Sequence, residues 1–364
     1  MSRPVHLIAA ARPNFMKVAP LYHELTRSAE FTPVLIHTGQ HYDANMSDDI
    51  FEDLGLPKPD HHMGVGSGSH AEQTAGVMVA YEKIAMKSRP EWLIVVGDVN
   101  STAACAMVGA KLHIPTVHLE AGLRSGDRAM PEEINRLVTD VLADVMWTPS
   151  PDGDVNLLAE GIPESRITRV GNIMLDSFEI IRPRLEAENS AARFGVEPSE
   201  YGIITLHRPS NVDEREKFSG IARKLAQAAS HMPLIFPAHP RTRAKIDEFA
   251  LSDMLTDAGI QIVDPQSYLP FMSLLKDAGI VITDSGGLQE ETTYLGIPCL
   301  TLRDNTERPI TIAEGTNQLV TADTLLAALE AALAADAPSP KRPEYWDGKT
   351  AARCVDDLRQ RTFL

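Results

Sequence analysis

Cysteine is scarce in this sequence, because only Cys105, Cys299 and Cys354 occur and they lie far apart. An odd number at such spacings gives neither a disulfide framework nor the paired spacing of a zinc site. No apolar run is long enough to cross a bilayer, and Val5–Ala11 is too short for the apolar core of a signal peptide. We therefore expect a reduced, cytoplasmic protein that binds no metal and does not enter the membrane.

An excess of basic residues is also lacking. The 34 Lys and Arg residues stand against 50 Asp and Glu residues, which gives a formal net charge of -16. A general binder of nucleic acid would present a basic face. The composition therefore argues against a nucleic-acid partner, although a few local cations and N–H groups can still hold an anionic small molecule.

The common nucleotide fingerprints are missing as well. The stretch "MGVGSGSHAEQ" (Met63–Gln73) has spaced glycines, but no buried strand precedes it, as the dinucleotide fingerprint requires. The sequence has no Walker A run and no HExxH motif. We therefore expect no cofactor, and we interpret Met63–Gln73 as a loop that caps a helix starting near Ala71.

Short apolar stretches alternate with helical ones along the chain, which predicts an α/β architecture with parallel sheets. A length of 364 residues favours two domains. The predicted strands are Val5–Ala9, Thr32–His37, Trp92–Val96, Thr116–Leu119, Val145–Thr148, Gly202–Leu206, Leu234–Pro237, Gln261–Val263, Ile280–Thr283 and Cys299–Leu302. The predicted helices include Asn14–Thr26, Ala71–Lys87, Ala103–Lys111, Pro131–Leu142 and Leu288–Leu295.

Motifs recur in the same order in both halves of the chain. "ARPNF" (Ala11–Phe15) is echoed by "HRPSN" (His207–Asn211), and "VVGDVNST" (Val95–Thr102) by "VITDSGGL" (Val281–Leu288). A general similarity among βα units is one explanation. We favour two doubly wound, Rossmann-like domains that face each other across a cleft. Ligands in such sheets lie beyond the carboxyl ends of the strands, which is where these motifs fall.

One strand-to-helix junction has the features of a phosphate site. The apolar run Gly279–Ile282 is followed by Ser285, Gly286 and Gly287 and then by a predicted helix. A helix N-terminus offers unpaired N–H groups and the positive end of its dipole, and glycine lets a ligand approach the backbone. The junction therefore predicts a phosphate site. The alternative is an ordinary turn capped by Ser285.

Carboxylates follow strands in the first half of the chain. Asp98 follows the third predicted strand, Glu120 follows the fourth, and Glu132 lies at the start of a helix. If the two strands are neighbours, their carboxylates share one cleft, where like charges push pKa values apart as acid/base catalysis requires. We interpret the three residues as a catalytic set. The alternative is that each caps a helix or pairs with Arg124 or Arg136.

The second half of the chain contributes cations and an aromatic side chain. His207 and Arg208 end one predicted strand, and His239 follows the next. Phe271 could stack on a base, although a phenylalanine in an apolar helix more often packs in the core. These residues predict an anionic ligand with an aromatic part.

Eight motifs that follow one another in order within Arg12–Gly315 resemble the non-hydrolysing UDP-N-acetylglucosamine 2-epimerases. They are "RPNFMKVAPL", "HTGQHYD", "GDVNST", "HLEAGLRSGDRAMPEEINRL", "TLHRPSN", "LPFMSLL", "TDSGGLQEE" and "RDNTERP". The resemblance implies the two-domain GT-B fold of one large group of glycosyltransferases, and a homodimer. We place the domains at residues 1–172 and 173–349, and by resemblance the C-terminal helix 350–364 rejoins the first.

The resemblance also implies roles for individual residues, with Phe271 at the uracil and Glu291 at the ribose hydroxyls. UDP would be held by Arg12, Gln266, Phe271, Ser285, Gly286, Gly287, Glu291 and Arg308. The reacting sugar would be surrounded by Lys17, Asp98, Glu120, Glu132, Arg136 and His207. An activating UDP-sugar site of many bacterial members would lie near Gln40, His41, Gln73 and His239. Beside that second site, Pro209 and Ser210 depart from the family pattern.

Inversion at carbon 2 of an amino sugar requires breaking an unactivated C–H bond. Loss of UDP with the carbon-2 proton gives a glycal, and re-addition with protonation on the other face gives the manno epimer. This route needs a cationic clamp for the departing UDP and acid/base groups near both ring faces. We assign proton transfer to Asp98, Glu120 and Glu132, and stabilisation of the leaving diphosphate to His207.

Several other functions are compatible with the motifs. The short version "EAGLRSGDRAMPEEINR" also resembles epimerases of UDP-diacetamido-uronic acids. A GT-B glycosyltransferase would share the fold, but simple transfer does not need three carboxylates. A hydrolase that releases free N-acetylmannosamine and a non-enzymatic UDP-sugar-binding regulator are the remaining alternatives.

Overall fold

The computed structural model describes residues 3–10, 12–39, 51–335 and 342–361. Contacts divide the chain into two compact units, Met1–Ile181 with Glu344–Leu364, and Arg182–Pro343. The division falls inside a helix, α7 (Ile173–Ala187), rather than in an irregular linker. The second unit is therefore an insertion into the chain of the first.

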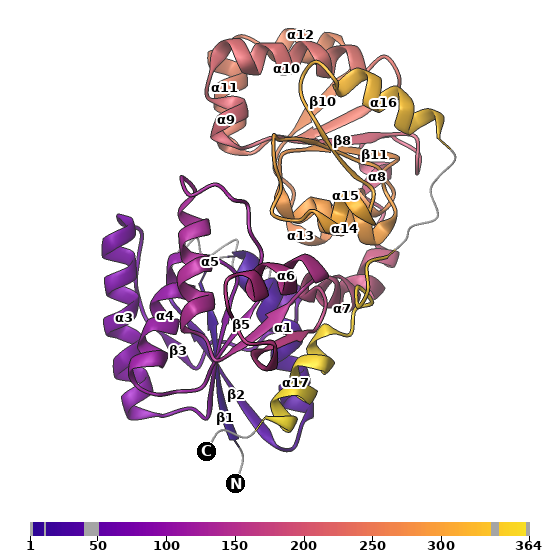
Figure 1. The fold of residues 1–364 in the computed structure, drawn as a ribbon. Helices are drawn as coiled ribbons and strands as arrows, with labels where there is room; N and C mark the ends of the chain where they lie inside the picture. Colours follow the sequence, from indigo (N-terminus) through magenta and orange to yellow (C-terminus); the bar gives the residue numbers. More distant parts are fainter. Residues whose placement is uncertain (1–2, 11, 40–50, 336–341, 362–364) are drawn as a thin grey trace. The chain divides into compact units, whose positions relative to one another are not determined.

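The first unit is built on a parallel sheet of seven strands in the order β3-β2-β1-β4-β5-β6-β7 (Figure 1). The strands are β1 (Arg3–Ala9), β2 (Phe31–His37), β3 (His61–His62), β4 (Trp92–Val96), β5 (Thr116–Leu119), β6 (Val145–Thr148) and β7 (Ile167–Arg169). Strand β4 is a run of five buried residues, as expected of a strand covered on both faces. The strand order reverses between β1 and β4, and ligand sites in such sheets lie at the carboxyl ends near that reversal.

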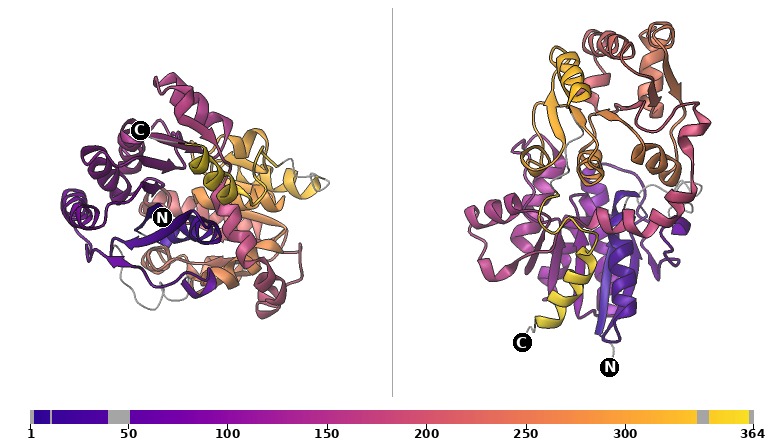
Figure 2. Two further views of the ribbon diagram at one scale, coloured as in Figure 1. Left: turned by 90° about the horizontal axis from the view of Figure 1, so that it is seen from below. Right: turned by 90° about the vertical axis from the view of Figure 1, so that its right-hand side faces the viewer.

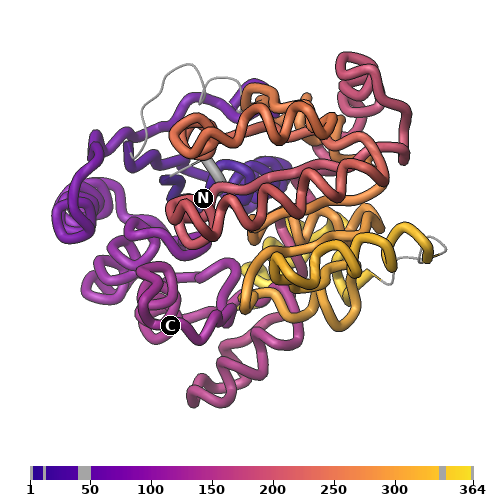
Figure 3. The backbone as a smooth tube through the Cα atoms, turned by 90° about the horizontal axis from the view of Figure 1, so that it is seen from above, coloured from indigo at the N-terminus to yellow at the C-terminus, as the bar shows by residue number. Residues whose placement is uncertain are grey.

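Helices cover both faces of this sheet. Helices α3, α4 and α5 pack against one another on one face, whereas α1 and α17 pack together on the other (Figures 1 and 3). The helices of this unit are α1 (Arg12–Arg27), α3 (His70–Lys87), α4 (Asn100–Lys111), α5 (Pro131–Leu142), α6 (Pro151–Ala159), the short η1 (Glu164–Arg166), α7 and α17 (Thr350–Gln360).

The glycine- and serine-rich stretch before α3 ends in a capping box. The Ser69 hydroxyl accepts a hydrogen bond from the Glu72 N–H (3.3 Å), and the Glu72 carboxylate accepts one from the Ser69 N–H (2.9 Å). These bonds satisfy donors that the first turn of a helix otherwise leaves unpaired. The prediction that this stretch caps the helix is confirmed.

Helix α17 packs beside α1 in the first unit (Figure 2). Polar contacts hold it in this position. The N–H groups of Thr350 and Ala351 donate to the buried Asp176 carboxylate at 3.0 and 2.8 Å. Farther along the helix, Asp357 accepts a hydrogen bond from the Trp147 indole at 2.8 Å. Asp176 thus caps α17 from another helix, since Lys349 at the N-cap position makes no side-chain capping bond.

The second unit contains a parallel sheet of six strands in the order β10-β9-β8-β11-β12-β13. The strands are β8 (Gly202–Thr205), β9 (Leu234–Pro237), β10 (Ile260–Val263), β11 (Ile280–Thr283), β12 (Cys299–Leu302) and β13 (Asn317–Val320). Its helices are α8 (Ser190–Arg193), α9 (Pro209–Val212), α10 (Arg215–Ala228), α11 (Pro240–Glu248), α12 (Ser252–Asp257), α13 (Tyr268–Lys276), α14 (Gly286–Leu295), α15 (Ile310–Ala313) and α16 (Leu325–Ala334). One core cluster joins the helices to the sheet, with Phe218 and Leu225 of α10 and Phe236, Ile282 and Leu300 of the strands all buried.

The structure confirms the predicted α/β architecture with parallel sheets. All ten predicted strands are present, and six of them keep their predicted bounds. Two further strands, β3 and β13, are absent from the prediction, and a third, β7, falls in the stretch "ITRVG" (Ile167–Gly171), which has a strand-like sequence. Each is short and lies at a sheet edge, where a strand has one neighbour and little apolar sequence to mark it.

Candidate active site

A buried ion pair lies at the carboxyl ends of β4 and β5. Lys17 of α1 pairs through Nζ with Oε2 of Glu120, which directly follows β5, and their side chains are 10% and 5% exposed. Gly97 follows β4 and makes room for the pair. A Cβ added to Gly97 would lie 3.1 Å from Lys17 Nζ and 3.6 Å from Glu120 Oε2. The structure therefore brings together two predicted site residues, Lys17 and Glu120.

Glu120 has a backbone conformation that is unusual for a residue with a side chain. Its φ of 69° lies in the left-handed region, where a Cβ is strained. Its N–H donates to the Trp147 carbonyl of β6 at 3.0 Å, so a neighbouring strand helps to hold the turn. Strain of this kind persists only where the surrounding structure maintains it. It is common at functional sites.

Asp98 and Arg136 form a second pair at the same carboxyl ends of the strands. Asp98 Oδ2 lies 2.9 Å from Arg136 Nη2 and 3.1 Å from Nε. Asp98 is one-third exposed, whereas Arg136 is buried. The pairing that we considered as an alternative for Asp98 is therefore present, but the carboxylate stays accessible to a ligand.

Two adjacent glutamates of α5 have different surroundings. Glu133 is buried, pairs with Arg136, and accepts hydrogen bonds from the N–H groups of Ser125 (3.0 Å) and Gly126 (2.9 Å). Burial alone would raise the pKa of Glu133, but these amides and Arg136 hold it below its ordinary value. Glu132, the predicted residue, is partly exposed and makes no ion pair with any residue that the structure describes. Sequence reasoning missed Glu133, which fixes Arg136.

The second group of predicted residues lies at the start of α14 in the second unit. Ser285 is the N-cap residue, yet its side chain makes no capping hydrogen bond, so the alternative of an ordinary serine-capped turn is wrong. The Ser285 N–H donates to the Thr283 hydroxyl at 2.9 Å. Gly287 faces open space, since an added Cβ would meet no atom within 4 Å. The first N–H groups of α14 are therefore approachable by an anion.

A buried acid that sequence reasoning did not assign organises the end of β8. Asp284 is completely buried and accepts hydrogen bonds from the N–H groups of His207 (3.1 Å) and Arg208 (3.0 Å) and from the Asn211 amide (3.2 Å). The His207 ring lies 3.3 Å from the same carboxylate and remains about half exposed. Burial lowers the pKa of His207, Asp284 opposes that effect, and Arg208 and His239 reinforce it. Asp284 belongs to the "TDSGGLQEE" motif, but its hydrogen-bond partners at the end of β8 can be identified only in the folded sheet.

Arg308 is held by carboxylates beside this turn. Its Nε lies 2.7 Å from Glu290, and its Nη1 lies 2.6 Å from Glu307. Glu307 in turn pairs with Arg303 at 2.9 Å. A Cβ added to Gly286 would lie only 2.6 Å from Glu307, so glycine is required there by close packing. Arg308 is therefore placed next to the N-terminus of α14.

Glu291 lies one turn into the same helix and is buried. Burial, followed by the nearby Glu290, raises the pKa of Glu291 to about 8. A buried carboxyl group has lost its hydrogen bonds to water, so a hydrogen bond from a ligand hydroxyl would stabilise it strongly. This environment fits the sequence-based expectation that Glu291 meets hydroxyl groups.

The remaining predicted residues are more dispersed. Phe271 is half-buried on α13, and the Gln266 amide donates to the Asp264 carbonyl at 2.7 Å. His239 is exposed and caps α11 by accepting the Arg241 N–H (3.3 Å). The side chain of Arg12 and the whole of Gln40 and His41 lie outside the described residues.

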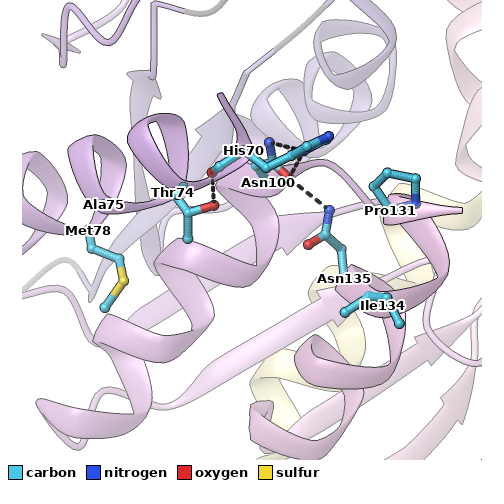
Figure 4. A pocket seen from close by; sticks show the side chains of 9 residues that line it. His70, Thr74, Ala75, Met78, Asn100, Pro131, Ile134 and Asn135 are labelled. Atoms are coloured by element: carbon cyan, nitrogen blue, oxygen red, sulfur yellow. Dashed lines mark hydrogen bonds between the residues drawn. The ribbon is translucent and has the colours of Figure 1, made fainter. Parts of the chain in front are cut away.

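A groove lies between α3, α4 and α5 in the first unit (Figure 4), and Asn100, which lines it, also contacts Gln73. Gln73 accepts a hydrogen bond from Asn100 at 2.9 Å, and Asn100 in turn contacts Asn135 at 3.2 Å. The groove has a volume of about 490 Å³ and is lined by His70, Ala71, Thr74, Ala75, Met78, Asn100, Pro131, Ile134 and Asn135. Its walls are mainly apolar, and only a few polar groups reach it.

Within the described ranges, no cluster of three or more His, Cys, Asp or Glu residues could hold a metal ion. Within the same ranges, no helix is long and apolar enough to cross a membrane. The three cysteines are buried and unpaired with each other. The polar chemistry described above is therefore that of carboxylates, cations and helix N–H groups.

Two doubly wound units with parallel sheets define the class as an enzyme of the two-domain GT-B fold. A lipopolysaccharide outer core galactosyltransferase superposes with a TM-score of 0.58 and 13% identity over 98% of this chain and 99% of that chain, which shows the shared fold alone. The family model of UDP-N-acetylglucosamine 2-epimerase matches residues 23–359. This chain belongs to the UDP-N-acetylglucosamine 2-epimerase family.

Known members of the family are similar to this chain over most of its length. A UDP-N-acetylglucosamine 2-epimerase from Methanocaldococcus jannaschii is 41% identical over 320 residues, which is 86% of this chain and 87% of that protein. A crystal structure of the enzyme from that organism in complex with UDP-GlcNAc and UDP has a TM-score of 0.88 at 39% identity, and covers 98% of this chain and all of that chain. A UDP-2,3-diacetamido-2,3-dideoxy-D-glucuronate 2-epimerase from Pseudomonas aeruginosa is 37% identical over 317 residues, 86% of this chain and 87% of that protein.

Proposed function

We propose that this isomerase interconverts UDP-N-acetylglucosamine and UDP-N-acetylmannosamine by inverting carbon 2 of the sugar. The observation that carries the proposal is the buried Lys17–Glu120 pair together with the Asp98–Arg136 pair at one sheet edge. Proton transfer at carbon requires an acid/base group held in a fixed position, and in this sheet cations hold both carboxylates. The relative from Methanocaldococcus jannaschii, whose crystal structure contains UDP-GlcNAc and UDP, supports the choice of substrate.

The reaction that suits this chemistry is elimination followed by re-addition. A carboxylate removes the carbon-2 proton, the C–H electron pair forms the C1–C2 double bond, and the C1–O bond breaks with its electron pair leaving on UDP. The glycal then takes UDP back at carbon 1, and a proton is delivered to the other face of carbon 2. The sugar loses a proton and UDP and regains UDP and a proton, which can come from solvent, so the oxidation state is unchanged and no outside oxidant or reductant takes part.

The second unit supplies the groups that would hold UDP. The N–H groups at Ser285–Gly287 and the cation of Arg308 would bind the diphosphate, which carries the charge that develops as it leaves. His207 would stabilise or protonate the same leaving group. Glu291 would accept hydrogen bonds from the ribose hydroxyls, and Phe271 and Gln266 would contact the base. Arg12 completes this set by resemblance.

Proton transfer would be carried out by carboxylates of the first unit. Glu120 is held by Lys17, and Asp98 is held by Arg136. Glu132 is partly exposed at the start of α5, where a ligand can reach it. We propose these three carboxylates as the proton-transfer set, with the choice of face for each to be decided by the variants described in the Discussion.

A second substrate deserves a direct test, because a relative that is 37% identical is named an epimerase of UDP-2,3-diacetamido-2,3-dideoxy-D-glucuronate. The reaction at carbon 2 would be the same. The two substrates differ at carbons 3 and 6, and groups that contact those carbons would decide between them. Both sugars should therefore be compared side by side.

The test is proton NMR of the purified protein with each UDP-sugar in D₂O. We expect a manno product from UDP-N-acetylglucosamine with deuterium at carbon 2, without added metal or nicotinamide cofactor. Turnover of the diacetamido-uronate alone would move the substrate assignment to that sugar. Binding of UDP without exchange or product from either sugar would contradict the proposed epimerase activity and favour a glycosyltransferase.

We further propose that the protein acts as a homodimer, as its resemblance to the epimerase family implies. Light scattering should give twice the chain mass of 39.8 kDa, and a single-chain mass would contradict the dimer. The cytoplasmic location stays a prediction.

A further inference from the structure

A buried histidine and a buried aspartate lie directly behind the candidate acid/base centre. His118 of β5 and Asp140 of α5 are both completely buried, and His118 Nδ1 lies 2.6 Å from Asp140 Oδ1. The other ring nitrogen, Nε2, lies 2.8 Å from the Gly97 carbonyl. A carbonyl oxygen can only accept, so Nε2 donates to Gly97, and Nδ1 is hydrogen-bonded to the Asp140 carboxyl group.

Asp140 uses its second oxygen to hold the neighbouring turn. Oδ2 accepts a hydrogen bond from the Gly122 N–H at 3.1 Å and another from Arg124 Nη2 at 2.7 Å. Burial alone would raise the pKa of Asp140, but the charges and hydrogen bonds of His118 and Arg124 lower it overall. The Asp140 carboxyl group therefore binds three groups, which use three of its four lone-pair directions.

These hydrogen bonds hold two turns next to the Glu120 side chain, the turn after β4 and the turn after β5. Gly97 is the residue after β4, and Gly122 lies two residues after Glu120. Gly97 adopts a φ of 66°, and its Cα faces the Lys17–Glu120 pair closely enough that an added Cβ would lie 3.1 Å from Lys17 Nζ. A shift of either turn would therefore move the Glu120 carboxylate relative to Lys17.

We propose that His118 and Asp140 are positioning residues, which lock the turns after β4 and β5 and so fix the Glu120 carboxylate for proton transfer. They act through Gly97 and Gly122 and do not touch the substrate. This inference rests on the proposed function in giving Glu120 a role in catalysis. Its structural part, the locking of the two turns, stands independently of which UDP-sugar is turned over.

The test compares two buried histidines of one sheet. His118→Gln removes the imidazole ring and its two hydrogen bonds. His6→Gln is the matched control, since His6 is also completely buried, on β1, with its Nδ1 3.2 Å from the Tyr81 hydroxyl. Steady-state epimerisation is measured well below the melting temperature of each variant. We expect kcat of His118→Gln to fall by about 10- to 100-fold with KM within twofold, because small misplacement of a reacting group acts on the transition state. We expect His6→Gln to lose stability and keep its kcat.

Two further measurements make the outcome decisive. Asp140→Asn keeps the size of the side chain and serves where His118→Gln does not fold, and it should show the same loss of kcat at constant KM. A folded His118→Gln or Asp140→Asn with kcat within twofold of the parent overturns the proposal. If the parent protein turns over none of the sugars, the proposed function has failed separately. Crystal structures then decide, because an unmoved Gly97 carbonyl and Glu120 carboxylate in the variant overturn the locking role.

Discussion

Lys17 and Glu120 are 103 positions apart in the sequence and form a buried ion pair. The pair exists because α1 follows β1, and β4 and β5 continue the sheet from β1 in that order. A substrate that reaches the carboxyl ends of these strands therefore meets the paired carboxylate and amino groups together.

Replacement of Glu120 by glutamine tests the proton-transfer role. Glu120→Gln keeps the shape of the side chain and removes its ability to take a proton. We expect carbon-2 deuterium exchange to fall by about 10²-fold or more, with UDP affinity changed by less than about threefold. Glu132→Gln, measured in parallel, tests the exposed member of the set in the same way.

A surface variant separates this effect from a general loss of charge. Glu91→Gln breaks the Arg3–Glu91 pair, which is partly exposed and has a distance of 2.6 Å, and it should leave exchange unchanged. Removal of Glu120 also leaves Lys17 buried without its partner, so a lower melting temperature is expected. Exchange by Glu120→Gln at the parent rate would exclude this residue as the proton-transfer group.

Gly287 offers a test of the phosphate site that does not disturb the fold. An alanine side chain at this position would meet no protein atom within 4 Å, and alanine is the better helix former. We expect Gly287→Ala to keep or slightly raise the melting temperature. If UDP occupies the space next to this backbone, its Kd should rise at least about tenfold, which is about 1.4 kcal/mol.

The neighbouring glycine provides the contrast. Gly286→Ala would place a methyl group 2.6 Å from the Glu307 carboxylate, so both stability and UDP affinity should fall. Isothermal titration with UDP and thermal unfolding measure the two quantities separately. Unchanged UDP affinity in Gly287→Ala would place the diphosphate elsewhere.

Two buried histidines should make the protein sensitive to acid. Burial is the main cause that lowers the pKa of His6 and of His37 to about 4, and the charges of His61 and His62 add to it. The unfolded chain binds protons on these rings below its ordinary pKa of about 6.5, so acidification from there to pH 4 favours unfolding. Each histidine should remove up to about 3 kcal/mol of the free energy of unfolding across that interval.

Urea unfolding at several pH values between 7.5 and 4.5 measures this loss. His6→Gln and His37→Gln each lack one titrating group and should lose less free energy than the parent protein on acidification. Carboxylates whose pKa values are lowered, such as Glu133, titrate in all three proteins and cancel in the comparison. Equal losses in parent and variants would contradict the assignment to these rings.

Asp176 should be essential for the docking of α17. Asp176→Ala leaves the buried N–H groups of Thr350 and Ala351 without an acceptor, which should lower the free energy of unfolding by about 2 kcal/mol or more. Asp356→Ala on the exposed side of α17 is the control and should change it by less than about 0.5 kcal/mol. Limited proteolysis should release the end of the chain sooner in Asp176→Ala alone. Parent-like cleavage and stability would show that α17 is held by other contacts.

The pattern of apolar runs predicted most of this fold because buried parallel strands have a strong local signature. Strand β4 is five apolar residues in a row, and its bounds were predictable. Strand β13 contains Asn317 and Gln318 and has one neighbour, so its pairing depends on β12 and not on its own residues. Edge strands of this kind have no signal in the sequence alone.

The sequence predicts which residue types lie at the strand ends of the candidate site. It predicts less well which residues pair with one another there. The i,i+3 spacing places Glu133 and Arg136 on one face of α5, but it does not show that the N–H groups of Ser125 and Gly126 also hold Glu133. Asp284 and His118 sit within recognisable motifs, yet their hydrogen bonds go to His207 and Gly97, on neighbouring strand ends. Such contacts are long-range in sequence, so local patterns cannot contain them.

The insertion of the second unit into the chain of the first has a consequence for synthesis. A ribosome makes the chain from the amino end, so residues 182–343 emerge before the segment that contains α17. The inserted unit can then fold while the first unit still lacks the helix that Asp176 and Trp147 anchor. The Lys17–Glu120 centre therefore belongs to the unit that is finished last, and a chain interrupted before Thr350 should hold a folded insert beside an incomplete host.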